Sequence, residues 1–294
     1  MSSKNRDSIG LFLGFNNLMV FNVETLKWKN YELFGEIKSL NPTIIFNAIK
    51  SAFNLQKLKA LIFTIMDSQF SSFKEAYNFR LKCKEFCEKN EIFHFSSVYT
   101  SIQSLIATTF TKTLVNKNDE IFAIFPSEKK QAIRAEKLIG KNGQYQVVEI
   151  IDIFDVSSFD EECKEKILKN SNPKKIIFLQ MSPDELESNF FSKCKEMFEK
   201  DKFSVEIPTK TGFEYARDAY VIKVLHLMDE MINPYNVTIH CQNKFAVICD
   251  GIPLITVKDR PVLPFEESVI IDFDLNKIVS VSFFINIFSL KGCE

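Results

Sequence analysis

Glycine is scarce in this chain: it supplies only 8 of the 294 residues. Folds that wrap backbone around phosphate groups usually place glycine where the chain passes closest to the phosphate, so few positions here could serve in that way. The sequence also contains no GxxxxGK[ST], no GxGxxG and no GxSxG. These absences exclude P-loop and dinucleotide-binding loops and the nucleophile elbow of α/β-hydrolases.

Metal and thiol chemistry has little support in the sequence. The only histidines, His94, His226 and His240, lie far apart, and none has a second ligand at a metal-binding spacing. We expect each to have a surface or core role rather than a catalytic one. The seven cysteines are scattered without a repeating CxxC pattern, which favours reduced thiols over a disulfide framework. We therefore predict no metal site and a cytoplasmic or nuclear location.

Long apolar runs and an excess of charge are missing as well. The longest apolar run, residues 278–290, is too short to span a bilayer, and the polar N-terminus does not resemble a signal peptide. The formal net charge is −1, so no global field favours nucleic acid or an anionic membrane. The basic residues from 129 to 141 are placed on the solvated face of a predicted helix. We expect neither nucleic acid nor a membrane as a partner.

What the chain does have is a large hydrophobic fraction, 46%, with 30 phenylalanines. Such a chain can bury a substantial core as one two-lobed domain or two smaller ones. Residues 9–23 predict a β-hairpin, because two apolar runs flank the turn at 14–17. Asn41 and Pro42 predict the start of a helix, as N-cap and first helical residue.

The remaining pattern divides the chain into an α/β body, residues 1–232, and an all-β tail, residues 233–294. Strands of the body are predicted at 26–33, 58–66, 91–95, 119–125, 144–154 and 174–180. Helices of the body are predicted from 41, and at 71–89, 100–110, 127–139, 158–170, 182–200 and 212–231, with Ser158 and Glu161 forming a capping box. Strands of the tail are predicted at 236–241, 244–249, 254–257, 268–273 and 277–288.

This order of elements, with several local strings, resembles the seventy-kilodalton heat-shock chaperone family. Residues 10–16, GLFLGFN, stand where that family has its first phosphate motif, Gly-Ile-Asp-Leu-Gly-Thr-Thr, and 121–127, IFAIFPS, stand at the second, Phe-Asp-Leu-Gly-Gly-Gly-Thr. Five further segments also resemble parts of that family: 58–76, 91–109, 176–197, 214–225 and 236–273. The resemblance implies a two-lobed actin-like (ribonuclease H-like) ATPase fold with shortened subdomains, followed by a truncated β-sandwich-like tail. It implies a remnant nucleotide cleft at Gly14, Asn16, Asn17 and Ser182.

The departures from the family pattern remove the groups that phosphate and magnesium need. Phe12 stands in place of one acid and Ala123 in place of another, and neither can accept a hydrogen bond through its side chain. Pro126 stands in a glycine run and has no backbone N–H to offer a phosphate. Gln180 and Met181 stand where the adenosine-side glycines would be. We predict that Phe12, Phe15 and Phe125 converge to fill the vacated cleft.

The function expected from this resemblance is that of a catalytically inactive pseudo-ATPase. It would act as a protein-interaction or scaffold module, with a protein or peptide partner and no cofactor. The alternative is a diverged chaperone that still binds ATP and magnesium and folds proteins. A third possibility is an unrelated two-lobed α/β enzyme whose site the sequence does not show.

Overall fold

The computed structural model describes residues 6–13, 17–33, 40–65, 69–97, 102–114, 116–127, 131–156, 160–180, 189–200, 205–206, 212–238, 244–250, 252–257 and 279–284. Of the predicted cleft residues, Asn17 lies within these ranges, whereas Gly14, Asn16 and Ser182 lie outside the described residues. The predicted tail strand 268–273 also lies outside them.

The first half of the body is a five-stranded sheet with three helices. Its strand order is β3-β2-β1-β4-β5; β1, β2 and β3 pair in antiparallel fashion, and β1, β4 and β5 in parallel fashion. The strands are β1 (Ser8–Phe12), β2 (Asn17–Asn22), β3 (Lys27–Glu32), β4 (Leu58–Thr64) and β5 (Phe93–Ser97). The helices are α1 (Pro42–Ala52), α2 (Phe73–Lys89) and α3 (Gln103–Phe110), and a short 3-10 turn, η1 (Leu55–Lys57), precedes β4.

The second half repeats the same plan. Its sheet has the order β10-β9-β6-β7-β8, in which β6, β9 and β10 are parallel and β7 and β8 are antiparallel. The elements are β6 (Glu120–Ser127), β7 (Ala132–Lys141), β8 (Gln144–Ile153), α4 (Glu161–Leu168), β9 (Lys175–Phe178), α5 (Asn189–Lys200), β10 (Val205–Glu206) and α6 (Gly212–Leu227).

Both halves therefore run strand, strand, strand, helix, strand, helix, strand, helix, and both have the same sheet order, with the first three strands forming a meander. This connectivity, used twice in one chain, is that of the actin-like, ribonuclease H-like fold. The prediction of the fold class is confirmed, because the duplicated topology follows from the strand pairings themselves.

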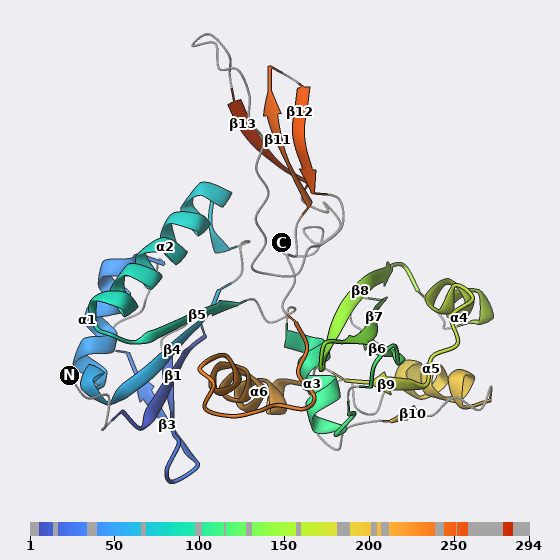
Figure 1. The fold of residues 1–294 in the computed structure, drawn as a ribbon, viewed down its shortest axis with the longest axis horizontal. Helices are drawn as coiled ribbons and strands as arrows, with labels where there is room; N and C mark the ends of the chain where they lie inside the picture. The colour runs from blue at the N-terminus through green and yellow to red at the C-terminus, as the bar shows by residue number, and fades with distance from the viewer. Residues whose placement is uncertain are drawn as a thin grey trace.

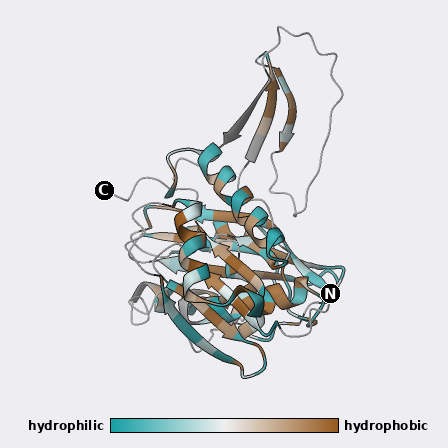
Figure 2. Cartoon of the chain, turned by 90° about the vertical axis from the view of Figure 1, so that its left-hand side faces the viewer, coloured by the Kyte–Doolittle hydropathy of each residue, from teal (hydrophilic) through white to brown (hydrophobic). Residues whose placement is uncertain are grey.

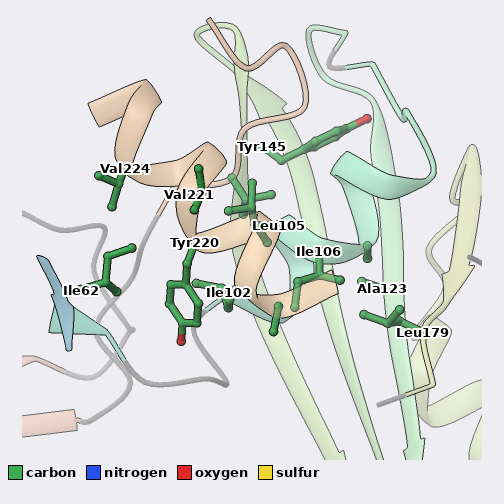
Figure 3. Packing of buried hydrophobic residues seen from close by; sticks show 14 of the residues in the cluster. Ile62, Ile102, Leu105, Ile106, Ala123, Tyr145, Leu179, Tyr220, Val221 and Val224 are labelled. Carbon is green, nitrogen blue, oxygen red and sulfur yellow. The ribbon is translucent and has the colours of Figure 1, made fainter. Parts of the chain in front are cut away.

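The two halves pack around a shared central layer (Figure 1). Helices α3 and α6 lie between the two sheets, and one hydrophobic cluster joins residues of both helices to residues of both sheets. A second cluster packs α1 and α2 on the outer face of the first sheet, and a third packs α4 and α5 on the outer face of the second. Figure 3 shows side chains of both central helices, among them Leu105, Ile106 and Tyr220, meeting in the middle of this layer.

Local sequence explains most of these elements. The Asn41 side chain accepts hydrogen bonds from the Thr43 and Ile44 amides, as expected for an N-cap. Strand β4 is almost wholly buried because helices cover both faces of its sheet, which is why its sequence, LKALIFT, is a nearly continuous apolar run.

The helix predicted at 127–139 is wrong: this segment contains the start of strand β7, which forms a long hairpin with β6. Ala, Glu and Lys favour helices, but the alternation of Ile133 and Ala135 with Arg134 and Glu136 has the period of a strand. The predicted capping box is also wrong, since Asp160 is the N-cap of α4 and accepts from the Cys163 amide.

The tail contains a three-stranded antiparallel sheet with the order β12-β11-β13, formed by β11 (Lys244–Cys249), β12 (Ile252–Val257) and β13 (Val279–Phe284). It projects from the α/β body (Figure 1), and hydrophobic residues run along β11 and β12 (Figure 2). The predicted strands 244–249 and 254–257 are confirmed. Among the described residues, no helix is both long enough and apolar enough to cross a membrane.

Residues 233–238 connect the body to this tail along the edge of β8. The Tyr145 amide donates to the Asn236 carbonyl at 2.8 Å, and the Thr238 amide donates to the Tyr145 carbonyl at 2.9 Å. The ammonium group of Lys223, on α6, donates to Asn236 Oδ1 at 2.9 Å and to the Val237 carbonyl at 2.8 Å. This connecting segment is therefore held by strand-like pairing on one side and by a buried lysine on the other.

Candidate functional site

In open α/β sheets, ligands bind beyond the carboxyl ends of the parallel strands. In this fold that rule indicates the region where β1 and β6 turn into their hairpins, β9 ends and α3 begins. Asn17, the described member of the predicted cleft, lies here as the exposed first residue of β2, near Leu13, which is 39% exposed.

The central face of β6 carries apolar side chains at this end. Ala123 is fully buried and Phe125 is 4% exposed, and both belong to the central cluster together with Leu179 of the neighbouring strand segment. Pro126 lies within β6, paired with Ile133 of β7. Ala123, at the position where the chaperone family has an acid, is thus part of the hydrophobic core. Pro126, at the position of a phosphate-binding glycine in that family, is part of the sheet.

The predicted convergence of Phe12 and Phe125 is wrong, because the two rings lie on different faces. Phe12 is fully buried in the outer cluster beneath α1 and α2, with its ring edge-on to Phe63 at 5.9 Å between centroids. Alternation along β1 is the cause: Leu11 faces the central helices, so its neighbour faces outward. Phe15, the third predicted ring, lies outside the described residues.

A buried polar network occupies the space between the first turn of α3 and the second sheet. Glu136 on β7 is 1% exposed; its carboxylate accepts from the Ser104 hydroxyl and from Arg134 Nε, the latter at 2.9 Å. The Arg134 guanidinium also lies 3.7 Å from a carboxylate oxygen of Asp152 on β8. The carboxylate that faces the start of α3 is thus already paired by the protein's own groups, so it is not free to bind magnesium.

Two buried amide side chains near this region lack hydrogen-bond partners within the described part of the chain. Gln180, which follows β9, is 3% exposed and neither its amide nitrogen nor its oxygen is paired; Gln103, at the start of α3, is 7% exposed and its amide oxygen is unpaired. Buried polar atoms are rarely left unsatisfied, so these are the groups that could bind water or a small polar ligand.

Sequence reasoning missed the network because it placed Arg134 and Glu136 on a solvated helix. The strand period of residues 132–141 was the available signal, and it puts both residues on the face that meets α3. No set of three or more His, Cys, Asp or Glu side chains that could hold a metal ion occurs among the described residues.

Comparison with known proteins gives distant structural likenesses. No protein-family model and no curated protein matches the sequence. MreB 5 of Spiroplasma citri, solved bound to AMPPNP, is 8% identical, with 76% of this chain and 97% of that one covered and a TM-score of 0.34. YeaZ from Pseudomonas aeruginosa is 6% identical over 53% of this chain and 70% of that one, at 0.27. An exopolyphosphatase from Cytophaga hutchinsonii is 11% identical over 66% and 71%, also at 0.27.

Scores of this size carry no argument, so the fold assignment rests on the strand order and connections of the chain itself. Two copies of one five-stranded topology enclose a pair of central helices, and the buried carboxylate of Glu136 is paired within the protein. This protein has the actin-like fold.

Proposed function

We propose that this protein is a catalytically inactive, heat-shock-chaperone-like module that uses the actin-like fold as a scaffold for protein interactions. The observation that carries the proposal is the buried network of Ser104, Glu136 and Arg134. Phosphoryl transfer needs a bound metal ion and free hydrogen-bond donors around the phosphate. In this network the carboxylate of Glu136 and the cation of Arg134, between α3 and the second sheet, are instead paired with each other. Ala123 and Phe125 support the same proposal, because both side chains are buried in the hydrophobic core and neither has a polar group for a phosphate or a metal ion.

The tail supplies the surface for the proposed partner. Among the described residues, strand β12 is an edge of the three-stranded sheet, and Ile252 on it is 66% exposed. An edge strand offers unpaired backbone groups to an extended peptide, and exposed apolar side chains add affinity. The occupant we propose is an extended, apolar segment of a partner protein.

Alternatively, Gln180 favours a diverged nucleotide-binding chaperone. Its buried, unpaired amide follows β9 where an adenosine-side residue would lie. A base that hydrogen-bonded to this amide would satisfy both of its polar atoms.

A nucleotide titration distinguishes the two candidates. We expect no stabilisation of the wild-type protein by magnesium-ATP or ADP in a thermal-shift assay, because the Glu136 carboxylate is already paired with Ser104 and Arg134. A ligand present at a hundred times its dissociation constant would stabilise the fold by about 2.7 kcal/mol. A shift of that size that is lost in Gln180→Leu, together with ATP hydrolysis above background, would establish the alternative.

The peptide proposal is tested at the edge strand. Ile252→Asp is expected to weaken binding of a fluorescently labelled apolar heptapeptide about tenfold, because burying an unpaired carboxylate opposes docking. Leu26→Asp is the matched control, since Leu26 is 73% exposed in the turn between β2 and β3, away from the tail. Equal peptide affinity in the wild type and both variants would contradict a role for β12.

A further inference from the structure

One side chain links the first half of the body directly to the last helix of the second half. The indole N–H of Trp28, on β3, donates to a carboxylate oxygen of Asp218, on α6, at 2.8 Å. The Trp28 ring packs beside Phe21, with centroids 5.2 Å apart, and the guanidinium of Arg217 lies 5.8 Å from the Trp28 ring centroid. The contact therefore combines a charge-assisted hydrogen bond with a cation–π interaction.

This link is part of a reciprocal arrangement. Helix α3 belongs to the first half, yet its Ser104 binds Glu136 in the second sheet. Helix α6 belongs to the second half, yet its Asp218 binds Trp28 in the first sheet, and the Lys59 ammonium at the start of β4 lies 2.5 Å from the Glu230 carboxylate just beyond α6. Each half thus holds the final helix of the other through polar bonds, in addition to the shared core in Figure 3.

We propose that the contact between Trp28 and Asp218 is a latch that fixes the orientation of the two halves. Compact units joined within one chain move relative to each other by default, unless their interface is large and hydrophobic. The shared core is such an interface, and the latch adds a directional bond to it. The latch lies at the edge strand of the first sheet, where a rotation of one half against the other would separate β3 from α6. Together with the shared core it couples the two halves, and this role does not depend on the proposed function.

The sequence provides a specific probe, because Trp28 is the only tryptophan in the chain. Its fluorescence therefore reports on the latch alone. In Asp218→Ala, we expect the acrylamide quenching constant of Trp28 to rise about twofold, since local opening exposes the indole. We also expect denaturant unfolding followed by fluorescence to occur before unfolding followed by far-UV circular dichroism, whereas the two coincide in the wild type.

The matched control is Glu85→Ala, which removes an exposed carboxylate from the outer helix α2. If the alanine variant at Asp218 does not fold, Asp218→Leu removes the acceptor oxygen while keeping the side-chain volume, and it must still raise quenching above that of the control. Quenching and unfolding of the Asp218 variant that match those of Glu85→Ala would overturn the latch, even if nucleotide and peptide binding were as proposed.

Discussion

Replacing Glu136 by alanine is expected to lower the free energy of unfolding by about 3 kcal/mol. The carboxylate is 1% exposed, and its removal leaves the Ser104 hydroxyl without its acceptor and takes from the Arg134 guanidinium a carboxylate oxygen 2.9 Å away. A cavity adds to the cost. Chemical unfolding followed by circular dichroism measures the change.

A matched control for Glu136 exists on the neighbouring strand. Glu149 on β8 pairs with Lys169 at 2.5 Å, but the side chains of this pair are 36% and 56% exposed. Alanine at this position should cost about 0.5 kcal/mol, because exposed ion pairs contribute little. Glu136→Gln, which keeps the shape and loses the charge, should fall between the two. Equal costs at both glutamates would show that the network does not hold α3 against the second sheet.

The second large effect is a pH dependence that belongs to Lys223. Burial lowers the pKa of this lysine from 10.5 to about 8, although its ammonium donates to Asn236 and Val237. Between those two pKa values the unfolded chain binds more protons than the folded protein, so this group makes stability rise with pH. From pH 7.5 to 9.5 we expect the wild type to gain about 2 kcal/mol relative to Lys223→Met.

The comparison must be a difference between the two proteins, because other groups titrate nearby. Burial raises the pKa of the thiol of Cys87 to about 12 and that of Cys194 to about 12, so these groups lower stability as pH rises above their ordinary value. Burial likewise raises the pKa of the Tyr145 phenol to about 12, which acts above pH 10. All are present in both proteins and cancel. Parallel pH profiles for the wild type and the methionine variant would contradict the assignment.

Glu136 and Lys223 make contacts that the sequence did not predict. The apolar runs of β1, β4, β6 and β9 and the cap at Asn41 predicted most of the body, because burial and capping depend on neighbours in the chain. Residues 127–139 were predicted as a helix, a state that their Ala, Glu and Lys residues favour, whereas pairing with β6 makes residues 132–141 a strand. The contacts of Lys223 could not be predicted at all, since its partners lie thirteen and fourteen residues further on and come into reach through the pairing at Tyr145.

The sequence by itself determined the class of fold, and it shows Phe12, Ala123 and Pro126 at positions from which no side chain could bind a phosphate or a magnesium ion. Those conclusions depend on residue type and order, which the chain displays directly. Only the tertiary structure decided which face these side chains occupy and what they contact. Strand alternation sends Phe12 to the outer face, and the folding of β7 beside β6 brings Glu136 to Ser104. Contacts between residues far apart in the chain depend on which strands pair, and that choice is made by burial of the whole core rather than by any local pattern.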